Sequence, residues 1–166
     1  MSNTLLCDTA VTPDGCVMVI EDVGTRGNSG TYVHADLDCE AGVAWDALWV
    51  HTMSDHECDV VGRAVRVRVF SGSDSRGLGV RVFDGELNVA SGILALGHRH
   101  NRGRQLLCGA ASIVRLTVFA GHSIEAIQFE GSDAEYPVSG PSEVNLLLHG
   151  DPAFVPVVSR PRAQWH

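Results

Sequence analysis

Lysine is absent from this chain of 166 residues, so all twelve of its Lys and Arg positions are arginine. Asp and Glu outnumber them at 20, which gives a formal net charge of -8 at pH 7. This negative excess disfavours binding to nucleic acid or to an anionic membrane surface, because both are themselves negatively charged. The same negative charge favours a basic partner.

Long hydrophobic runs are missing as well. The apolar stretches are only a few residues long, whereas a membrane-spanning helix needs about 20 consecutive apolar residues. The first residues, MSNTLLCDTAVTPDG, contain neither the basic region nor the long apolar region of a secretory signal. We therefore expect a soluble, cytoplasmic protein that has no membrane partner.

Familiar catalytic and cofactor motifs are also absent. The chain has no C-x-x-C pair, no G-x-S-x-G elbow, no H-E-x-x-H pair and no Walker sequence. Its five cysteines are an odd number at long spacings, which favours reduced thiols over a disulfide framework. They are Cys7, Cys16, Cys39, Cys58 and Cys108. No cofactor is expected from these features.

Strand signals dominate what is present. In residues 64–70, Val65, Val67 and Val69 alternate with Arg66 and Arg68, which predicts a strand with its valines in the core and its arginines in solvent. Similar runs cover 16–22, 31–37, 79–89, 93–96, 112–119, 124–129 and 144–149, separated by clusters of Gly, Asp, Ser and Asn. Many short strands divided by such turns predict an all-β fold, an antiparallel β-sandwich of jelly-roll-like or barrel-like form.

We expect one such domain over residues 1–150, with at most one short helix. Residues 40–53 combine a partly helical apolar stripe with a segment, 48–50, that also fits a buried strand, so both assignments stay open there. The segment 151–166 contains Pro152, Pro156 and Pro161. It is predicted to be a tail that wraps the surface, because proline cannot pair in the middle of a sheet.

The predicted core consists of apolar residues that fall on the inner faces of these strands. They are Val65, Val67, Val69, Val80, Val82, Leu87, Val89, Leu94, Leu96, Val114, Leu116, Val118, Leu146 and Leu148.

Charge is unevenly distributed along the sequence. Residues 1–60 contain eleven acids and one base, whereas residues 61–166 contain nine acids and eleven arginines. If the first sixty residues form one face, that face would attract a basic partner. The candidate partner-binding residues are Asp36, Asp38, Glu40, Asp46, Asp55, Glu57 and Asp59. The alternative is that these acids only solvate the tips of loops.

The densest polar segment is residues 97–104, GHRHNRGR. In an extended chain His98 and His100 would project to the same side, a spacing that metal-binding strands use. A third ligand is not evident in the sequence, and the neighbouring arginines disfavour a cation. We therefore predict no bound transition metal and keep a metal site at His98 and His100 only as the alternative.

One family resemblance rests on two segments, FDGELNVASGILAL at 83–96 and IVRLTVFAG at 113–121. They resemble the small bacterial β-sandwich proteins grouped with the competence-type DNA-entry nuclease inhibitor. In that family a strand, a small-residue-Ser-Gly step, a second strand and a late strand of alternating Arg and Val recur. The sequence departs from the pattern at Ala110, Ala111 and Ser112, where a glycine-aromatic approach would be expected. The resemblance implies an inhibitor or immunity-like protein and identifies no functional residue.

The leading hypothesis is a non-enzymatic β-sandwich that binds another protein, such as a basic nuclease or toxin, through the acidic first third. The second hypothesis is a metal-binding β-sandwich enzyme centred on His98 and His100. The third is a structural subunit that assembles through its strand edges, as a homo-oligomer, because unpaired edges are natural association sites.

Overall fold

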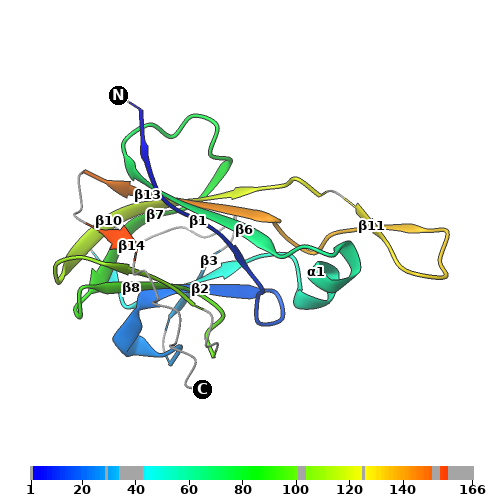
Figure 1. Ribbon diagram of the computed structural model, residues 1–166, viewed down its shortest axis with the longest axis horizontal. Helices are drawn as coiled ribbons and strands as arrows, with labels where there is room; N and C mark the ends of the chain where they lie inside the picture. Colours follow the sequence, from blue (N-terminus) through cyan, green and yellow to red (C-terminus); the bar gives the residue numbers. More distant parts are fainter. Residues whose placement is uncertain are drawn as a thin grey trace, which may run out of the picture.

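The computed structural model describes residues 2–28, 30–33, 43–100, 104–124, 126–150 and 154–156. Two six-stranded sheets make up most of this part of the chain and lie in two layers (Figure 1). In spatial order the first sheet contains β1 (Thr4–Val11), β6 (Val65–Gly72), β13 (Glu143–His149), β10 (Ser112–Gly121), β7 (Val80–Val89) and β4 (Ala44–Trp45). The second contains β14 (Val155–Pro156), β9 (Gln105–Cys108), β8 (Ile93–Gly97), β2 (Val17–Asp22), β5 (Ala47–His51) and β3 (Thr31–Val33).

Four smaller elements lie outside these sheets. The strands β11 (Ala126–Gln128) and β12 (Glu135–Pro137) form a separate two-stranded sheet that projects from the body (Figure 1). The helix α1 (Asp55–Val61) lies near its base, and η1 (Val23–Thr25) is a single 3-10 turn. No helix in the described ranges combines the length and the apolar character needed to cross a membrane.

The predicted all-β class with at most one short helix is confirmed. Most strand pairs are antiparallel, but β6 with β13, β4 with β7 and β3 with β5 are parallel. Both sheets are therefore mixed rather than purely antiparallel. The sequence did not predict this because parallel neighbours are joined by distant segments of chain, and strand alternation carries no information about the direction of the neighbour.

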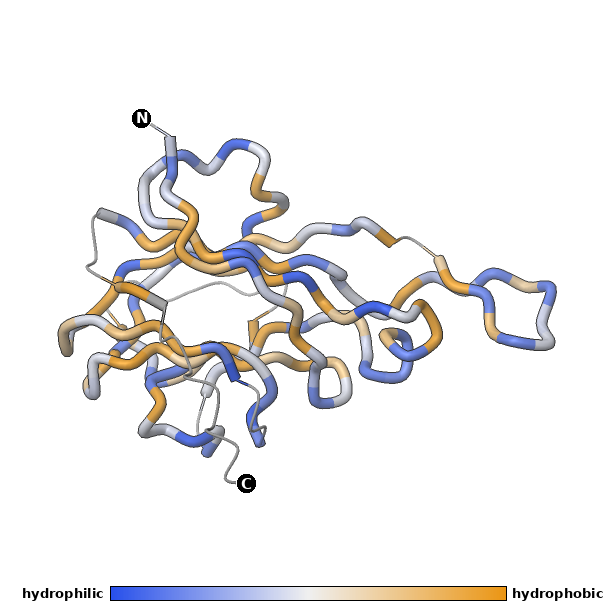
Figure 2. The backbone as a smooth tube through the Cα atoms, in the orientation of Figure 1, coloured by the Kyte–Doolittle hydropathy of each residue, from blue (hydrophilic) through white to orange (hydrophobic). Residues whose placement is uncertain are grey.

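A single hydrophobic cluster fills the space between the layers and draws on both sheets. Figure 2 shows hydrophobic segments concentrated in the strands of the two layers and hydrophilic ones in many of the connections. Thirteen of the fourteen predicted core residues are buried, and Val65, Val67 and Val69 are completely so. Arg66 is exposed as predicted, whereas Arg68 is only half-exposed and its Nε donates to the Asn145 side chain of β13 at 2.9 Å.

Val80 is the exception, because its side chain is 65% exposed. It lies two residues before the buried Val82 on β7 and so on the same face of that strand. At this end of the molecule, however, the space between the layers is an open pocket that Val80 lines instead of a closed core. The prediction that Val80 belongs to the core is thus wrong, because strand alternation specifies a face but not whether another sheet covers it.

The open question over residues 40–53 is resolved for the part that the structure describes. Residues 44–51 form β4 and β5 and not a helix. Within the second sheet β5 lies between β2 and β3, and Ala47, Leu48 and Val50 are buried. A strand buried on both faces has a nearly continuous apolar sequence, which periodicity alone cannot distinguish from a buried helix.

The helix α1 begins immediately after this region. Ser54 is its N-cap, and its hydroxyl accepts the Glu57 backbone N–H while the Glu57 carboxylate accepts the Ser54 N–H. Gly62 ends the helix in the left-handed region, at φ +77°, where a residue without Cβ is favoured. This Ser-x-x-Glu capping box is a sequence signal for the start of a helix, and it lies just beyond the segment 40–53 in which a helix was considered.

The described part of the predicted tail lies at a sheet edge. Val155 and Pro156 form β14, which pairs with β9 at the outer edge of the second sheet, and Phe154 beside them is buried. An edge is where proline can be tolerated in a sheet. Four of the five cysteines are within the described residues, and all four are free thiols.

Candidate functional site

The seven acids predicted to bind a partner do not all fall in the described structure. Asp36, Asp38 and Glu40 lie outside the described residues. Asp46 is exposed between β4 and β5, where its carboxylate accepts a hydrogen bond of 3.4 Å from Asn88. The other three, Asp55, Glu57 and Asp59, are on α1. Whether all seven share one surface stays a prediction.

Glu57 differs from its two neighbours on α1, because it is buried and its carboxylate is occupied. Its Oε1 accepts the backbone N–H of Ser54 at 2.8 Å, and its Oε2 accepts that of Ser139 at 2.8 Å. The hydroxyl of Ser139 also donates to Oε1. Burial raises the pKa of Glu57, but the hydrogen bonds from Ser139 and Ser54 outweigh it and hold this pKa below its ordinary value. Glu57 therefore joins α1 to residue 139 instead of facing a partner.

Replacing Glu57 by glutamine is expected to lower the free energy of unfolding by about 1–3 kcal/mol near pH 7, because buried N–H groups lose a charged acceptor. Since the folded pKa is lowered, the contribution of Glu57 is complete above its ordinary carboxyl pKa and is lost as the pH falls through the folded value. Urea unfolding measured from neutral to strongly acid pH should therefore bring the Glu57→Gln variant and the wild type together at low pH. A difference that is constant with pH would contradict this role, and Asp59→Asn on the exposed side of α1 is the control.

The two histidines of the metal alternative lie close together, with ring centroids 6.0 Å apart. Their nitrogen atoms are largely engaged, however. Nδ1 of His98 accepts the backbone N–H of His100 at 3.0 Å, Nε2 of His98 lies 3.8 Å from Asp14, and Nε2 of His100 accepts from Arg99 at 2.8 Å. Within the described ranges no group of three or more His, Cys, Asp or Glu side chains is placed to hold a metal ion. The predicted absence of a transition metal stays a prediction.

The most distinctive surface is formed by the projecting hairpin, which we call the arm (residues 126–137), together with α1. A turn closes the arm where the Ser132 N–H donates to the Phe129 carbonyl at 3.1 Å, with Gly131 at φ +79°. The rings of His56 on α1 and Phe129 are stacked at 5.6 Å, and Phe129 meets Tyr136 edge-on at 5.5 Å. This row of three rings ties the arm to the helix.

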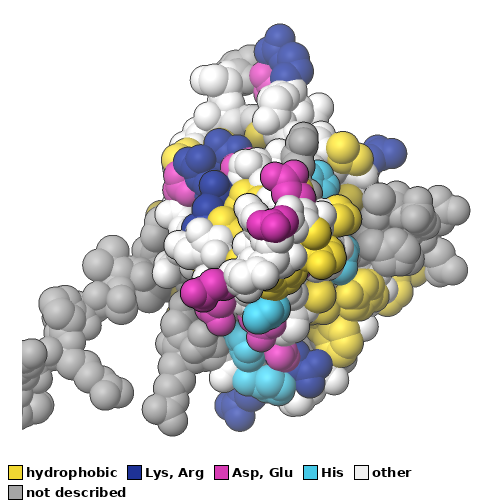
Figure 3. Space-filling view, turned by 90° about the vertical axis from the view of Figure 1, so that its right-hand side faces the viewer, with side chains coloured by type: hydrophobic (Ala, Val, Ile, Leu, Met, Phe, Trp, Pro, Cys, Tyr) yellow, Lys and Arg dark blue, Asp and Glu magenta, His cyan; other side chains and the backbone are white. Residues whose placement is uncertain are grey.

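Five exposed carboxylates accompany the three rings: Asp55, Asp59, Glu130, Asp133 and Glu135. None of the ion pairs of the described residues includes any of the five. Arg63, which follows α1, donates to the hydroxyl of Ser123 at 2.6 Å. Figure 3 views this end of the molecule and shows acidic side chains beside hydrophobic and histidine side chains. We call these five acids and three rings the acidic arm surface.

Sequence reasoning found only part of the acidic arm surface. Asp55 and Asp59 are among the predicted residues, whereas Glu130, Asp133 and Glu135 belong to residues 61–166, the part of the chain that carries a net positive charge. The missing information is the contact between α1 and β11, which brings residues more than sixty positions apart together. The only local signal was the turn sequence Gly131-Ser132-Asp133, which predicted a loop but not its place beside the helix.

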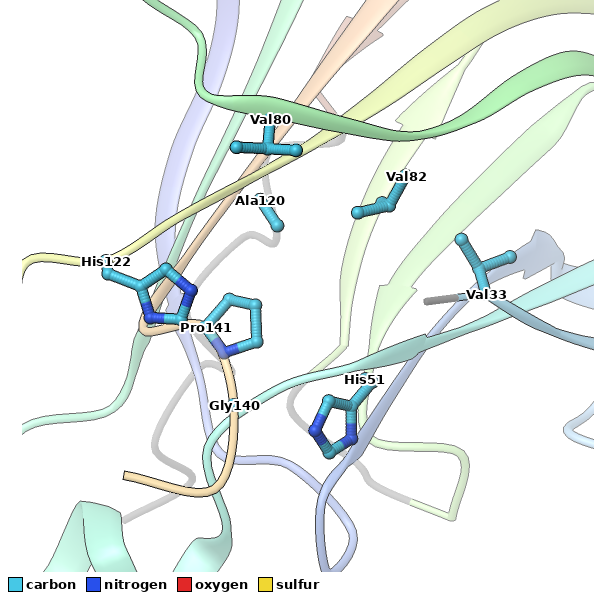
Figure 4. A pocket seen from close by; sticks show the side chains of 8 residues that line it. All are labelled: Val33, His51, Val80, Val82, Ala120, His122, Gly140 and Pro141. Carbon is cyan, nitrogen blue, oxygen red and sulfur yellow. The ribbon is translucent and has the colours of Figure 1, made fainter. Parts of the chain in front are cut away.

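The second candidate site is the pocket at the open end between the layers (Figure 4). Its volume is about 320 Å³. The lining residues are Val33, His51, Val80, Val82, Ala120, His122, Gly140 and Pro141. They come from β3, β5, β7 and β10 and from the two segments that connect the arm to the body. The sequence does not predict this pocket, because it forms where the two sheets separate.

No family model, curated protein or solved structure matches the chain, so these comparisons do not identify either site.

Proposed function

We propose that the protein is a non-enzymatic binding protein that takes a basic partner protein on the acidic arm surface. The observation that carries this proposal is the set of five exposed carboxylates on α1 and the arm, without an ion pair among the described residues, together with the row of rings that joins these two elements. Carboxylates in this position attract a positively charged partner and speed its association. The family resemblance implies a nuclease as the partner, and the negative charge of the surface favours a basic one.

The three rings offer a partner stacking contacts that the carboxylates cannot make. Aromatic side chains contribute strongly to protein interfaces, and arginine stacks favourably on their faces. Tyr136 is 47% exposed and lies in β12 between Glu135 and Pro137. A partner that presents arginine would therefore gain an ion pair and a ring contact at the same place.

A structural assembly subunit is the second candidate, because the sheet of β11 and β12 has only two strands among the described residues. Each strand consequently has one edge without a neighbouring strand in that sheet. Open strand edges can pair with another chain. A second copy that docked there would make the mass in solution depend on concentration, which sedimentation velocity detects.

The test of the acidic arm surface is an NMR titration with hexa-arginine as the basic probe. We expect amide shifts to change mainly in α1 and the arm, with an affinity that falls as salt is raised toward 0.15 M, where the screening length is about 8 Å. Replacing Asp59, Glu130 and Asp133 together by their amides is expected to weaken binding about tenfold, because three attractive charges are removed.

The matched control removes three carboxylates elsewhere: Asp46→Asn, Glu86→Gln and Glu143→Gln. Both triple variants have the same net charge, so an effect of total charge alone would weaken binding equally in the two. Equal weakening, or shift changes centred on Asp46 and Glu86, would overturn the assignment of the binding surface to the arm.

A further inference from the structure

The pocket between the layers has features of a ligand site that is already formed. Gly140 lies so close to the second sheet that a Cβ there would collide with the Thr52 carbonyl. Next to it, the Pro141 carbonyl accepts the Met53 backbone N–H at 2.9 Å. These contacts hold the 140–141 wall at a set distance from β5, so the pocket is fixed by backbone and not only by mobile side chains.

The chemistry of the lining is mainly apolar. Val33, Val80, Val82, Ala120 and Pro141 present hydrocarbon to the pocket, as Figure 4 shows. None of the eight lining residues is an acid or an arginine. Because this space is open, the Val80 side chain stays 65% exposed although it lies on the core-facing side of its strand. Leaving its hydrocarbon in contact with water is unfavourable.

Two imidazoles supply the polar contacts. Nε2 of His51 is 2.7 Å from the Ser139 carbonyl oxygen, which can only accept, so this nitrogen must carry the proton. Nδ1 of His51 is 3.5 Å from the Tyr32 hydroxyl, so both ring nitrogens already face a polar atom. His122 is exposed at the rim, and no hydrogen bond to its ring is found within the described residues. His122 is therefore the group available to a ligand.

We propose that this pocket binds a small neutral molecule with an apolar body and one hydroxyl-type head group, with the head group hydrogen-bonded to His122. The volume of about 320 Å³ is at the lower end of the usual range for ligand pockets. The lining selects a neutral ligand, because an ionised group would lose water there without a charged side chain to replace it. The apolar walls bind the body of the ligand, and one imidazole orients it.

The probes are straight-chain alcohols, measured by isothermal titration calorimetry on the full chain. We expect 1-hexanol, 1-heptanol and 1-octanol to bind with affinity rising about fourfold per added methylene, the increment for burying one CH₂ group. Octanoate and octylamine, which have a similar body and a charged head, are expected to bind at least about tenfold more weakly than 1-octanol. Tighter binding of octanoate, or no binding of any alcohol, would overturn the proposal.

Val80→Trp and His122→Ala test the location of the site, and Ile113→Trp is the control. Val80→Trp should block the mouth of the pocket and reduce 1-octanol affinity at least about tenfold, while Ile113→Trp should leave it unchanged. Ile113 is the matched control, since it is also exposed, at 60%, and lies at the other end of the adjoining strand β10. His122→Ala should weaken 1-octanol severalfold without changing the gain per methylene. Equal binding by Val80→Trp and Ile113→Trp would place the alcohol elsewhere and refute the pocket as its site.

Discussion

Replacing Arg104 by alanine is expected to lower the free energy of unfolding by about 3–5 kcal/mol, because it leaves a buried carboxylate without its counter-charge. The carboxylate is that of Glu21 in the middle of the second sheet, whose side chain has no exposed surface. Nη2 of Arg104 binds its Oε1, and the Gly27 N–H donates to both oxygens at 2.9 and 3.0 Å. A single backbone N–H cannot replace the arginine.

Urea unfolding near pH 7 measures this effect, and two variants define its cause. Replacing Glu21 and Arg104 together by methionine should recover much of the loss, because no charge is then buried. Arg76→Ala should leave the midpoint unchanged, since Arg76 and its partner Asp74 form an ion pair in which the arginine side chain is 90% exposed. If Arg104→Ala were as stable as Arg76→Ala, the ion pair with Glu21 would not contribute to folding.

Truncating Leu116 to alanine is expected to cost about 2–4 kcal/mol, from lost burial and from the cavity that remains. Leu116 lies in β10, a central strand of the first sheet between β7 and β13, and it is completely buried. Val67 on β6 is equally buried, and its truncation to alanine serves as a second variant of the same face.

The control for Leu116 lies on the same strand. Ile113→Ala removes a side chain that is 60% exposed, and it should change stability by no more than about 0.5 kcal/mol. Thermal or urea unfolding distinguishes the two variants. Equal stability of Leu116→Ala and Ile113→Ala would mean that β10 presents its other face to the core.

The all-β class and most of the core follow from local patterns in the sequence. The alternation in β6 is a local property, since side chains of a strand point to opposite faces whatever lies beside it. For this reason Val65, Val67 and Val69 could be assigned to the core before any neighbour was known. The capping box of Ser54 and Glu57 is local in the same sense, and it was available as a signal for α1.

The order of the strands in each sheet and the place where the layers separate depend instead on contacts between distant segments. Val80 has the pattern of a core residue, but no local rule states that the opposing sheet leaves a pocket in front of it. In the sequence Glu57 resembles the other acids of the first sixty residues. In the structure it is buried and accepts a hydrogen bond from Ser139, which is distant in the sequence.

The acidic arm surface depends on the same kind of information. Its five carboxylates come from α1 and from the arm, and the ring contact between His56 and Phe129 joins these two distant segments. Periodicity and capping act over a few residues, whereas sheet order, pockets and shared surfaces arise from contacts between distant segments. Composition and strand alternation therefore predicted an acidic β protein, whereas the contact between α1 and β11 brings two acidic segments of the chain side by side.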